Sequence, residues 1–289
     1  MRARPGVPAD AAPAGSPHAW SRTPLALLGS AHPGPALAVT VLAALLATAL
    51  DMSASQALLV TAAVLCGQLS IGWSNDLVDL SRDRAVGRRD KPLAVGALDP
   101  RVAIAACATA VVLCVVLSLA CGPVAGLVHL VCVASGWAYN LGLKATAWSW
   151  APYAVAFGLL PVFVWLAGDG RQSDGGWPPL WLPLAAACLG VGAHLLNVLP
   201  DIDDDAATGV RGLPHRLGAR RLPAASVVVL GAGSALVLLG AEVTPWVAAI
   251  GLAVVAVLGA VVLRGRGRAP FAAAVGIALL DAMLLVVTL

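Results

Sequence analysis

Two regularly spaced groups of polar residues contain four of the 15 acidic side chains of this chain. Both repeat at a spacing of four residues, and they comprise Asn75, Asp79 and Asp83 in the first group and Asn197, Asp201 and Asp205 in the second. Residues four apart on an α-helix lie one turn apart on the same face. We therefore expect each group to form a polar ridge, with Asp76 one position off the first ridge and His194 one turn deeper on the second.

These ridges have a composition that suits metal-assisted phosphate chemistry. Stacked carboxylates repel one another, and at a helix C-terminus they also oppose the helix dipole, so a cation must neutralise them. Mg²⁺ prefers oxygen ligands and typically takes one or two carboxylates together with substrate phosphates and water. Basic groups that bind phosphate lie near both ridges, namely Arg82, Arg84, Arg88, Arg89, Lys91, Arg211 and Arg216. Solvated loops would explain one such group, but two on separate helices indicate a diphosphate site bridged by metal.

The elements that position these residues are predicted to be membrane helices. The 289 residues are 60% hydrophobic and 11% charged, with a mean hydropathy of +0.88. This composition excludes a soluble enzyme with a single anchor, because soluble domains carry about 25% charged residues. Apolar stretches long enough for a bilayer-spanning helix occur nine times, at about 35–50, 57–74, 101–121, 123–141, 151–167, 179–199, 222–240, 244–263 and 270–288. We expect an all-α, polytopic membrane protein with nine transmembrane helices.

The basic residues predict the orientation of these helices. With nine crossings, every Lys and Arg except Arg171 falls on the side of the N-terminus and the even-numbered loops. The positive-inside rule therefore predicts a multi-pass protein of the cell (inner) membrane, with a cytoplasmic N-terminus and an external C-terminus. Residues 1–33 are rich in Pro, Ala, Gly and Ser and are expected to form a disordered cytoplasmic tail, or a short interfacial helix around 20–28. Residues 34–289 form the predicted membrane domain.

The motifs around both ridges resemble a known family. The first ridge, followed by the segment Asp90-Lys91-Pro92-Leu93-x-x-Gly96, resembles the first signature of the UbiA superfamily of intramembrane prenyltransferases. The second ridge, with Gly209 and the segment 216–218, resembles the second signature. The segment from Tyr139 to Lys144 is similar to the Tyr/Lys element that lies between the two signatures in the family. The chain departs from the family pattern at two points. Tyr139 and Lys144 are five residues apart, where the family's pair is more often four apart, and many members have Arg where this chain has Lys91.

The resemblance implies a helical bundle around a chamber open to lipid, with a cytoplasmic polar cap that holds Mg²⁺ and an isoprenyl diphosphate. The implied catalytic residues are Asp76, Asp79, Asp83, Asp201 and Asp205, and the implied metal ligands are Asn75, Asp79, Asp83, Asp201 and Asp205. The implied substrate-binding residues are Asn75, Arg88, Lys91, Tyr139, Lys144, Asn197 and His194.

The expected activity is transfer of the prenyl group to an aromatic or other lipophilic acceptor, with release of pyrophosphate. A terpene cyclase of the same superfamily, acting on the diphosphate alone, is one alternative, and a membrane transporter is another; no nucleic-acid partner is expected. Trp73 and Trp137 could stabilise a carbocation through their ring faces or anchor the helices at the membrane boundary. Asp281 lies well inside the last helix, where an ionisable residue indicates a function unless it is a neutral helix contact.

Overall fold

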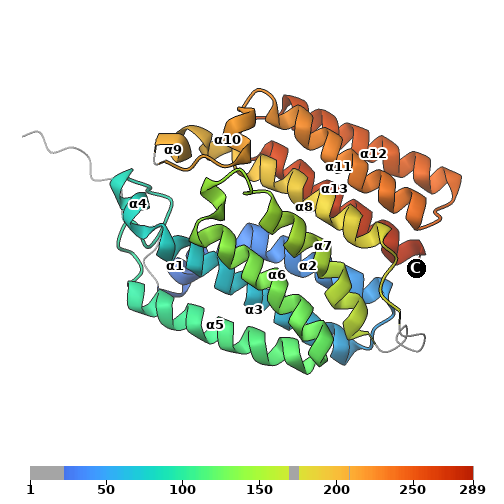
Figure 1. Ribbon diagram of the computed structural model, residues 1–289, viewed down its shortest axis with the longest axis horizontal. Helices are drawn as coiled ribbons and strands as arrows, with labels where there is room; N and C mark the ends of the chain where they lie inside the picture. The colour runs from blue at the N-terminus through green and yellow to red at the C-terminus, as the bar shows by residue number, and fades with distance from the viewer. Residues whose placement is uncertain (1–22, 169–175, 208, 289) are drawn as a thin grey trace, which may run out of the picture.

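The structure is a computed structural model that describes residues 23–168, 176–207 and 209–288, and its regular elements within those residues are all helices. Nine long helices lie side by side in a bundle (Figure 1): α2 (Pro33–Ala49), α3 (Ala54–Val78), α5 (Pro100–Ala120), α6 (Pro123–Leu141), α7 (Ala151–Ala167), α8 (Trp181–Asn197), α11 (Leu222–Gly240), α12 (Pro245–Arg264) and α13 (Ala269–Thr288). The short elements are α1 (Thr23–Ser30), α4 (Leu80–Ala85), η2 (Leu143–Ala145), η4 (Leu199–Asp201), α9 (Ile202–Ala207) and α10 (Leu213–Leu217).

Each of the nine predicted apolar stretches is one of these long helices, which confirms the all-α architecture. Seven of the described helices are long and apolar enough to cross a membrane, or eight if α1 and α2, which meet at a 67° bend, count as one span. The predicted count of nine spans is therefore not reached. The difference arises because α2 and α7 have only 17 residues each, which is a length of about 25 Å.

The long helices close into a ring through their packing contacts. Along the ring, α2, α3, α6, α7, α8, α11, α12 and α13 follow one another, α13 returns to α2, and α5 packs outside α3 and α6. The outer surface is apolar, as in the 80% exposed side chain of Leu239, because lipid rather than water surrounds a membrane bundle. The ring leaves space inside it for the cavities described below.

The segment before α2 is ordered where a tail was expected. Residues 1–22 lie outside the described residues, but Thr23–Ser30 form α1, so this part agrees with the alternative of a short helix around 20–28 and not with a disordered tail extending to residue 33. The Trp73 indole N–H on α3 donates to the carbonyl oxygen of Leu27 (2.9 Å). Ala26 is fully buried against Leu93 and its neighbours. These tertiary contacts order a segment whose local composition predicts disorder.

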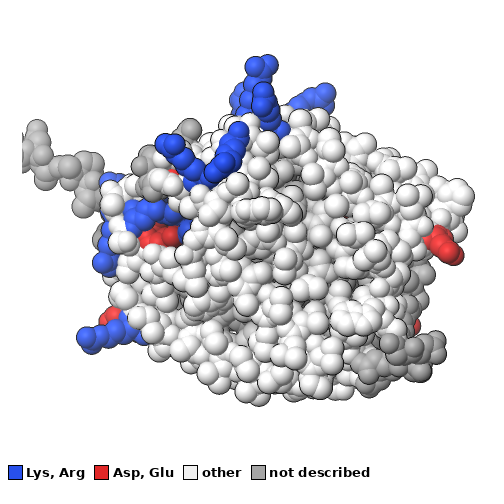
Figure 2. Space-filling model, in the orientation of Figure 1, with Lys and Arg blue, Asp and Glu red and all other residues white. Residues whose placement is uncertain are grey.

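Charge is concentrated at one end of the bundle. Figure 2 shows Lys and Arg side chains over the end that carries α4, α9 and α10, whereas the middle of the visible face is almost free of charge. Both acidic groups found in the sequence lie at this charged end, since α3 leads into α4 and α8 leads through η4 into α9.

The contact between α3 and the bend before α2 generates the first prediction. A Cβ on Gly72 would overlap the carbonyl oxygen of Ala31 and lie 2.6 Å from its carbonyl carbon. Gly72→Ala is expected to lower the thermal unfolding midpoint by several degrees, because overpacking costs about 1–3 kcal/mol. Unfolding is measured by intrinsic Trp fluorescence of the detergent-purified protein.

Gly34→Ala is the matched control, because a Cβ there meets nothing within 4 Å and Ala is the better helix former. If both variants unfold at the same temperature as the wild type, the close approach of α3 to the bend does not exist.

Candidate functional site

A polar cavity of about 820 Å³ opens at the charged end of the bundle. Its walls come from α3, the α4–α5 loop, α6 and η2 on one side, and from the end of α8, η4, α9 and α10 on the other. The lining contains every residue predicted for the site except Asp83, namely Asn75, Asp76, Asp79, Arg88, Lys91, Tyr139, Lys144, His194, Asn197, Asp201 and Asp205. The structure therefore brings together residues that lie more than a hundred positions apart in the sequence.

One ammonium group joins two carboxylates of the first group. Lys91 Nζ lies 3.0 Å from Asp76 Oδ1 and 2.9 Å from Asp83 Oδ2. The Lys91 side chain is only 12% exposed. Burial alone lowers the pKa of Lys91, but the charges of Asp76 and Asp83 outweigh it and raise the pKa above its ordinary value. Lys91 therefore stays charged. Its ion pair with Asp83 keeps that carboxylate next to the cavity, although Asp83 is not one of the lining residues.

Asp79 has cations of its own. Lys144 Nζ donates to both of its carboxylate oxygens (2.5 and 2.6 Å), and Arg82 Nη2 donates to Oδ2 (2.8 Å). Asp79 lies between the end of α3 and the start of α4, so its side chain can face η2 across the cavity. Burial lowers the pKa of Lys144, because its one carboxylate partner compensates less than the two partners of Lys91 do.

The ridge itself is arranged differently from the prediction. Asn75 Nδ2 donates to Asn140 Oδ1 on α6 (3.1 Å), and Asn140 in turn donates to Ser74 Oγ (2.8 Å). The cation contacts belong instead to Asp76, Asp79 and Asp83, whose three- and four-residue spacings also place them on one helical face. Asn75 lines the cavity, and Asp76, predicted one position off the ridge, joins Asp79 and Asp83 in the ion-pair network.

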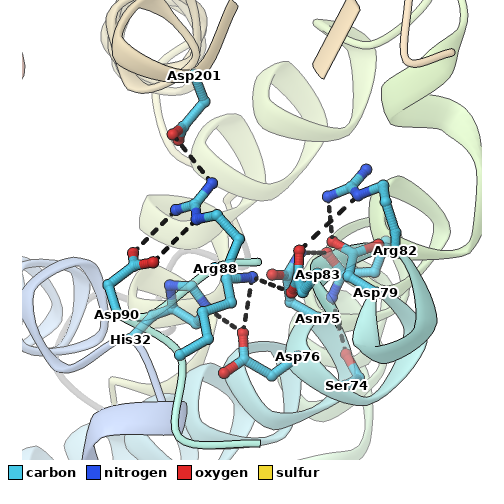
Figure 3. Close-up of polar contacts among 12 residues, drawn as sticks. His32, Ser74, Asn75, Asp76, Asp79, Arg82, Asp83, Arg88, Asp90 and Asp201 are labelled. Atoms are coloured by element: carbon cyan, nitrogen blue, oxygen red, sulfur yellow. Dashed lines mark hydrogen bonds and ion pairs between the residues drawn. The ribbon is translucent and has the colours of Figure 1, made fainter. Parts of the chain in front are cut away.

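Two arginines contact the second acidic group: Arg88 links it to Asp90, as Figure 3 shows, and Arg82 links it to Asp79 of the first group. The Arg88 guanidinium donates to both oxygens of Asp90 (2.9 Å each) and to Asp201 Oδ1 (3.2 Å). The hydrogen bond with Asp90 raises the pKa of Arg88, and Arg88 lowers the pKa of Asp90 to about 2. Arg82 Nη1 lies 4.0 Å from Asp205 Oδ1. The two groups therefore converge on one cavity, as the sequence predicts.

The helix that carries the second group breaks where the sequence places a proline. Helix α8 ends at Asn197, and Pro200 lies in η4 before α9 begins. The break turns Asp201 toward Arg88 and Asp205 toward α10, where His215 Nε2 lies 3.7 Å from Asp205 Oδ2. Burial raises the pKa of Asp205 and lowers that of His215.

His32 is a site residue that the sequence analysis missed. Its Nε2 lies 2.8 Å from Asp76 Oδ1, and it lines the cavity at the bend between α1 and α2. The backbone of His32 is in the left-handed region (φ 52°), which is uncommon for residues other than glycine. Strained conformations of this kind are concentrated at functional sites. A lone histidine before Pro33 gives no spacing signal, because its partner lies on another helix.

Below the polar cavity lies an apolar chamber of about 230 Å³, lined by residues of α2, α3, α6, α7, α8 and α13. Asn75, Tyr139 and Asn197 line both spaces and mark the boundary between them. The Tyr139 and Tyr153 rings meet edge to face, with centroids 5.3 Å apart, and the His194 ring lies 4.6 Å from that of Tyr153. The boundary is therefore aromatic.

Trp73 and Trp137, expected to stabilise a cation or anchor the helices, lie away from both spaces. Trp73 donates to Leu27, and Trp137 Nε1 donates to Ser70 Oγ (3.2 Å). Both belong to a packing cluster with Ala31 and Cys107, and neither lines the polar cavity or the chamber. The role in stabilising a cation is therefore wrong for these two tryptophans.

The ion-pair network around the polar cavity carries an excess of negative charge. Its Lys and Arg members are Arg82, Arg88, Lys91 and Lys144, and its carboxylates are Asp76, Asp79, Asp83, Asp90, Asp201 and Asp205. Among the residues that the structure describes, no three His, Cys, Asp or Glu side chains come close enough together to hold a metal ion. The carboxylates are instead separated by the cations between them.

Comparison with known proteins identifies the family of the chain and solved structures that share its fold. The model of the UbiA prenyltransferase family matches residues 36–280. No curated protein sequence matches the chain.

Solved structures with the same fold cover nearly the whole chain. A UbiA homologue from Aeropyrum pernix K1 has a TM-score of 0.72 at 20% identity, covering 88% of this chain and 98% of that one. A UbiA homologue from Archaeoglobus fulgidus, bound to GPP and Mg²⁺, has a TM-score of 0.66 at 16% identity, covering 91% and 99%. A digeranylgeranylglyceryl phosphate synthase has a TM-score of 0.60 at 16% identity, covering 91% and 97%. At these identities the likeness shows the fold.

The shared ammonium group generates the second prediction. Lys91→Met leaves Asp76 and Asp83 buried without their common cation. Removing one partner of a buried ion pair costs about 3–5 kcal/mol, so we expect a large fall in the thermal unfolding midpoint of the purified protein.

Arg89→Met is the matched control, because Arg89 is exposed and two residues away, and surface substitutions usually change stability by about 0.5 kcal/mol or less. Equal unfolding midpoints for the two variants would show that Lys91 does not neutralise this pair of carboxylates.

Proposed function

Because the chain belongs to the UbiA prenyltransferase family, we propose that it is an Mg²⁺-dependent intramembrane prenyltransferase. Its substrates are an isoprenyl diphosphate and a lipophilic acceptor, and it releases pyrophosphate. One observation carries this proposal: carboxylates and cations from two distant segments face a single polar cavity directly above an apolar chamber. A diphosphate with a hydrocarbon tail has the same division between charged and apolar parts.

The donor set of the polar cavity suits Mg²⁺. Carboxylate oxygens come from Asp76 and Asp79 on one wall and from Asp201 and Asp205 on the other, and the carboxylates of the network outnumber its Lys and Arg. Mg²⁺ typically takes one or two carboxylates and completes its shell with substrate phosphates and water, so a ready-made three-residue cluster is unnecessary. When bound, Mg²⁺ supplies positive charge that stabilises the departing diphosphate.

The basic side chains provide the phosphate contacts of the proposal. Arg88 and Lys144 are partly buried, line the cavity and are aimed at its carboxylates. Charge-assisted hydrogen bonds from such groups to the leaving oxygens are strong, and they are stronger where water is excluded. When a diphosphate and divalent cations enter together, the carboxylates can turn to the metal while Arg88, Lys91 and Lys144 turn to the phosphates.

The aromatic boundary between the two spaces lies where the prenyl group would become a carbocation. Loss of diphosphate leaves a carbocation at the first carbon of the tail, which lies just below the polar cavity in this arrangement. Tyr139 and Tyr153 line the chamber at that level, and aromatic rings attract cations. The apolar lining of the chamber keeps water, which would capture the cation, away from the tail.

His194 can direct a hydrogen bond to the substrate. The Ser149 hydroxyl accepts a hydrogen bond from the backbone N–H of Leu213 (2.9 Å), and it lies 3.1 Å from His194 Nε2, to which it can donate. In that arrangement the proton of the neutral imidazole lies on Nδ1. His194 Nδ1 is buried and has no hydrogen-bond partner among the described residues. An oxygen of the diphosphate or of the acceptor would satisfy it.

Membrane orientation follows from the charged end. Since this end carries the basic loops, we place the polar cavity on the cytoplasmic side of the cell membrane. The C-terminus then lies outside, at the far end of α13. This orientation gives a soluble diphosphate and Mg²⁺ direct access from the cytoplasm.

The third prediction concerns metal dependence. Purified protein with Mg²⁺ and geranyl, farnesyl or geranylgeranyl diphosphate, supplied with a lipid extract as the source of acceptor, is expected to release pyrophosphate, and EDTA should stop the release. Asp79→Asn and Asp201→Asn are expected to lower the rate about a hundredfold or more, because each removes a charge that positions metal and cations at the leaving group.

Asp51→Asn makes the same chemical change in an exposed residue outside the polar cavity, so it should retain the wild-type rate. Asn also tolerates the left-handed backbone of position 51 (φ 53°). Full activity in both Asp79→Asn and Asp201→Asn would show that the two acidic groups do not form the metal site.

The fourth prediction separates transfer from cyclisation. With Mg²⁺ and the diphosphate alone we expect no cyclic product, and with a lipid extract supplied as the source of acceptor we expect prenylated lipids by mass spectrometry. The physical reason is that ionisation at the polar cavity is common to both reactions, whereas only a transferase needs a second molecule to capture the cation. A cyclic hydrocarbon or alcohol formed without acceptor would instead assign the chain to the terpene cyclases.

A further inference from the structure

A second, smaller space lies next to the apolar chamber. This end pocket, of about 50 Å³, shares the lining residues Leu42, Phe157, Leu189 and Ala278 with the chamber. The chamber in turn shares Asn75, Tyr139 and Asn197 with the polar cavity. The chamber therefore lies between the polar cavity and the end pocket. The end pocket shares no lining residue with the polar cavity.

A single carboxyl group lies in the lining of the end pocket. Asp281 of α13 is 1% exposed, and it is the only polar side chain among the fourteen residues that line this pocket. Ser234 of α11 donates a hydrogen bond to its Oδ2 (2.8 Å). The other oxygen, Oδ1, is buried and has no hydrogen-bond partner among the described residues.

Helix packing gives a hydrogen-bond partner to only one of the two oxygens of the Asp281 carboxyl group. The contact with Ser234 joins α13 to α11 through Oδ2, but Oδ1 gains nothing from it. Leaving a buried polar atom without a partner costs about 1–3 kcal/mol. A buried polar oxygen that packing does not satisfy, beside an unfilled space, indicates that a ligand atom satisfies it.

The end pocket is poorly suited to hold water alone. Its volume is large enough for one water molecule, but a buried water typically makes about three hydrogen bonds. The lining offers a single unsatisfied oxygen, and every other side chain is apolar. The occupant that matches this lining is a hydrocarbon group that carries one polar atom.

We propose that Asp281 binds a hydroxyl group carried near the distal end of the isoprenoid tail, and so selects an oxygenated isoprenyl diphosphate. A hydroxyl fits because it both donates and accepts, so it can satisfy Oδ1 whether the carboxyl group is protonated or ionised. This inference rests on the proposed function, which places the diphosphate in the polar cavity and the tail in the chamber. It adds to that function a recognition site for the far end of the tail.

The test compares pairs of ligands on the full-length protein. Geranyl, farnesyl and geranylgeranyl diphosphate are each paired with the analogue that bears a hydroxyl on a terminal methyl group, and their Kd values are measured with Mg²⁺ by equilibrium dialysis of the radiolabelled compounds. At the chain length that reaches the end pocket, we expect the hydroxylated member to bind about tenfold more tightly, as a hydrogen bond to a buried, otherwise unsatisfied group allows.

Asp281→Leu removes the oxygen at similar side-chain size and is expected to abolish the preference while leaving the Kd of the plain diphosphates within about threefold. Equal Kd values within all three wild-type pairs would overturn the inference, and so would a preference that survives in Asp281→Leu. The wild-type comparison needs no variant, so it decides the question even if Asp281→Leu fails to fold.

The design separates the failure of this inference from the failure of the proposed function. If the plain diphosphates bind and release pyrophosphate but no pair shows a preference, only the role of Asp281 is wrong. If none of the six compounds binds, the proposed function fails and the inference fails with it.

Discussion

The constraint behind the whole structure is that several carboxylates lie together at the boundary of a membrane bundle and must be neutralised. Lys91 serves Asp76 and Asp83, Lys144 serves Asp79, and Arg88 serves the second acidic group. Each of these cations has at least one partner from a different part of the chain. The ion pairs therefore hold the ends of separate helices together. The break at η4 and the bend at His32 are the backbone features that bring the remaining partners within reach.

The site depends equally on the close contact between a charged cavity and an apolar chamber. The polar cavity and the apolar chamber meet at Tyr139 and Asn197, which contact both environments. The ring of helices supplies the chamber walls, and α2, α7 and α13 all contribute to them. A ligand with a charged head and an apolar tail therefore finds both of its halves matched without a change of the bundle. This match, more than any single residue, supports the prenyl diphosphate as substrate.

Much of this arrangement could be predicted from the sequence, because membrane helices and carboxylate clusters have strong physical signatures. Apolar length located all nine long helices, and the need to neutralise clustered carboxylates predicted their convergence. The spacing of four grouped Asn75 with Asp79 and Asp83, whereas the cation contacts are made by Asp76, Asp79 and Asp83. The role of His32 and the positions of Trp73 and Trp137 were out of reach, because only contacts between separate segments determine them.

Helices α2 and α7, of 17 residues each, contact each other and both line the chamber. At about 25 Å they fall short of the roughly 30 Å hydrocarbon thickness of a typical bilayer. Such a mismatch is relieved by local thinning of the bilayer, at a modest energetic cost. Where α2 faces lipid, such thinning would bring headgroups nearer to the level of the aromatic boundary. An amphiphilic acceptor could approach from this side with its polar group already close to the reacting carbon, so the bilayer itself would help to align the two substrates.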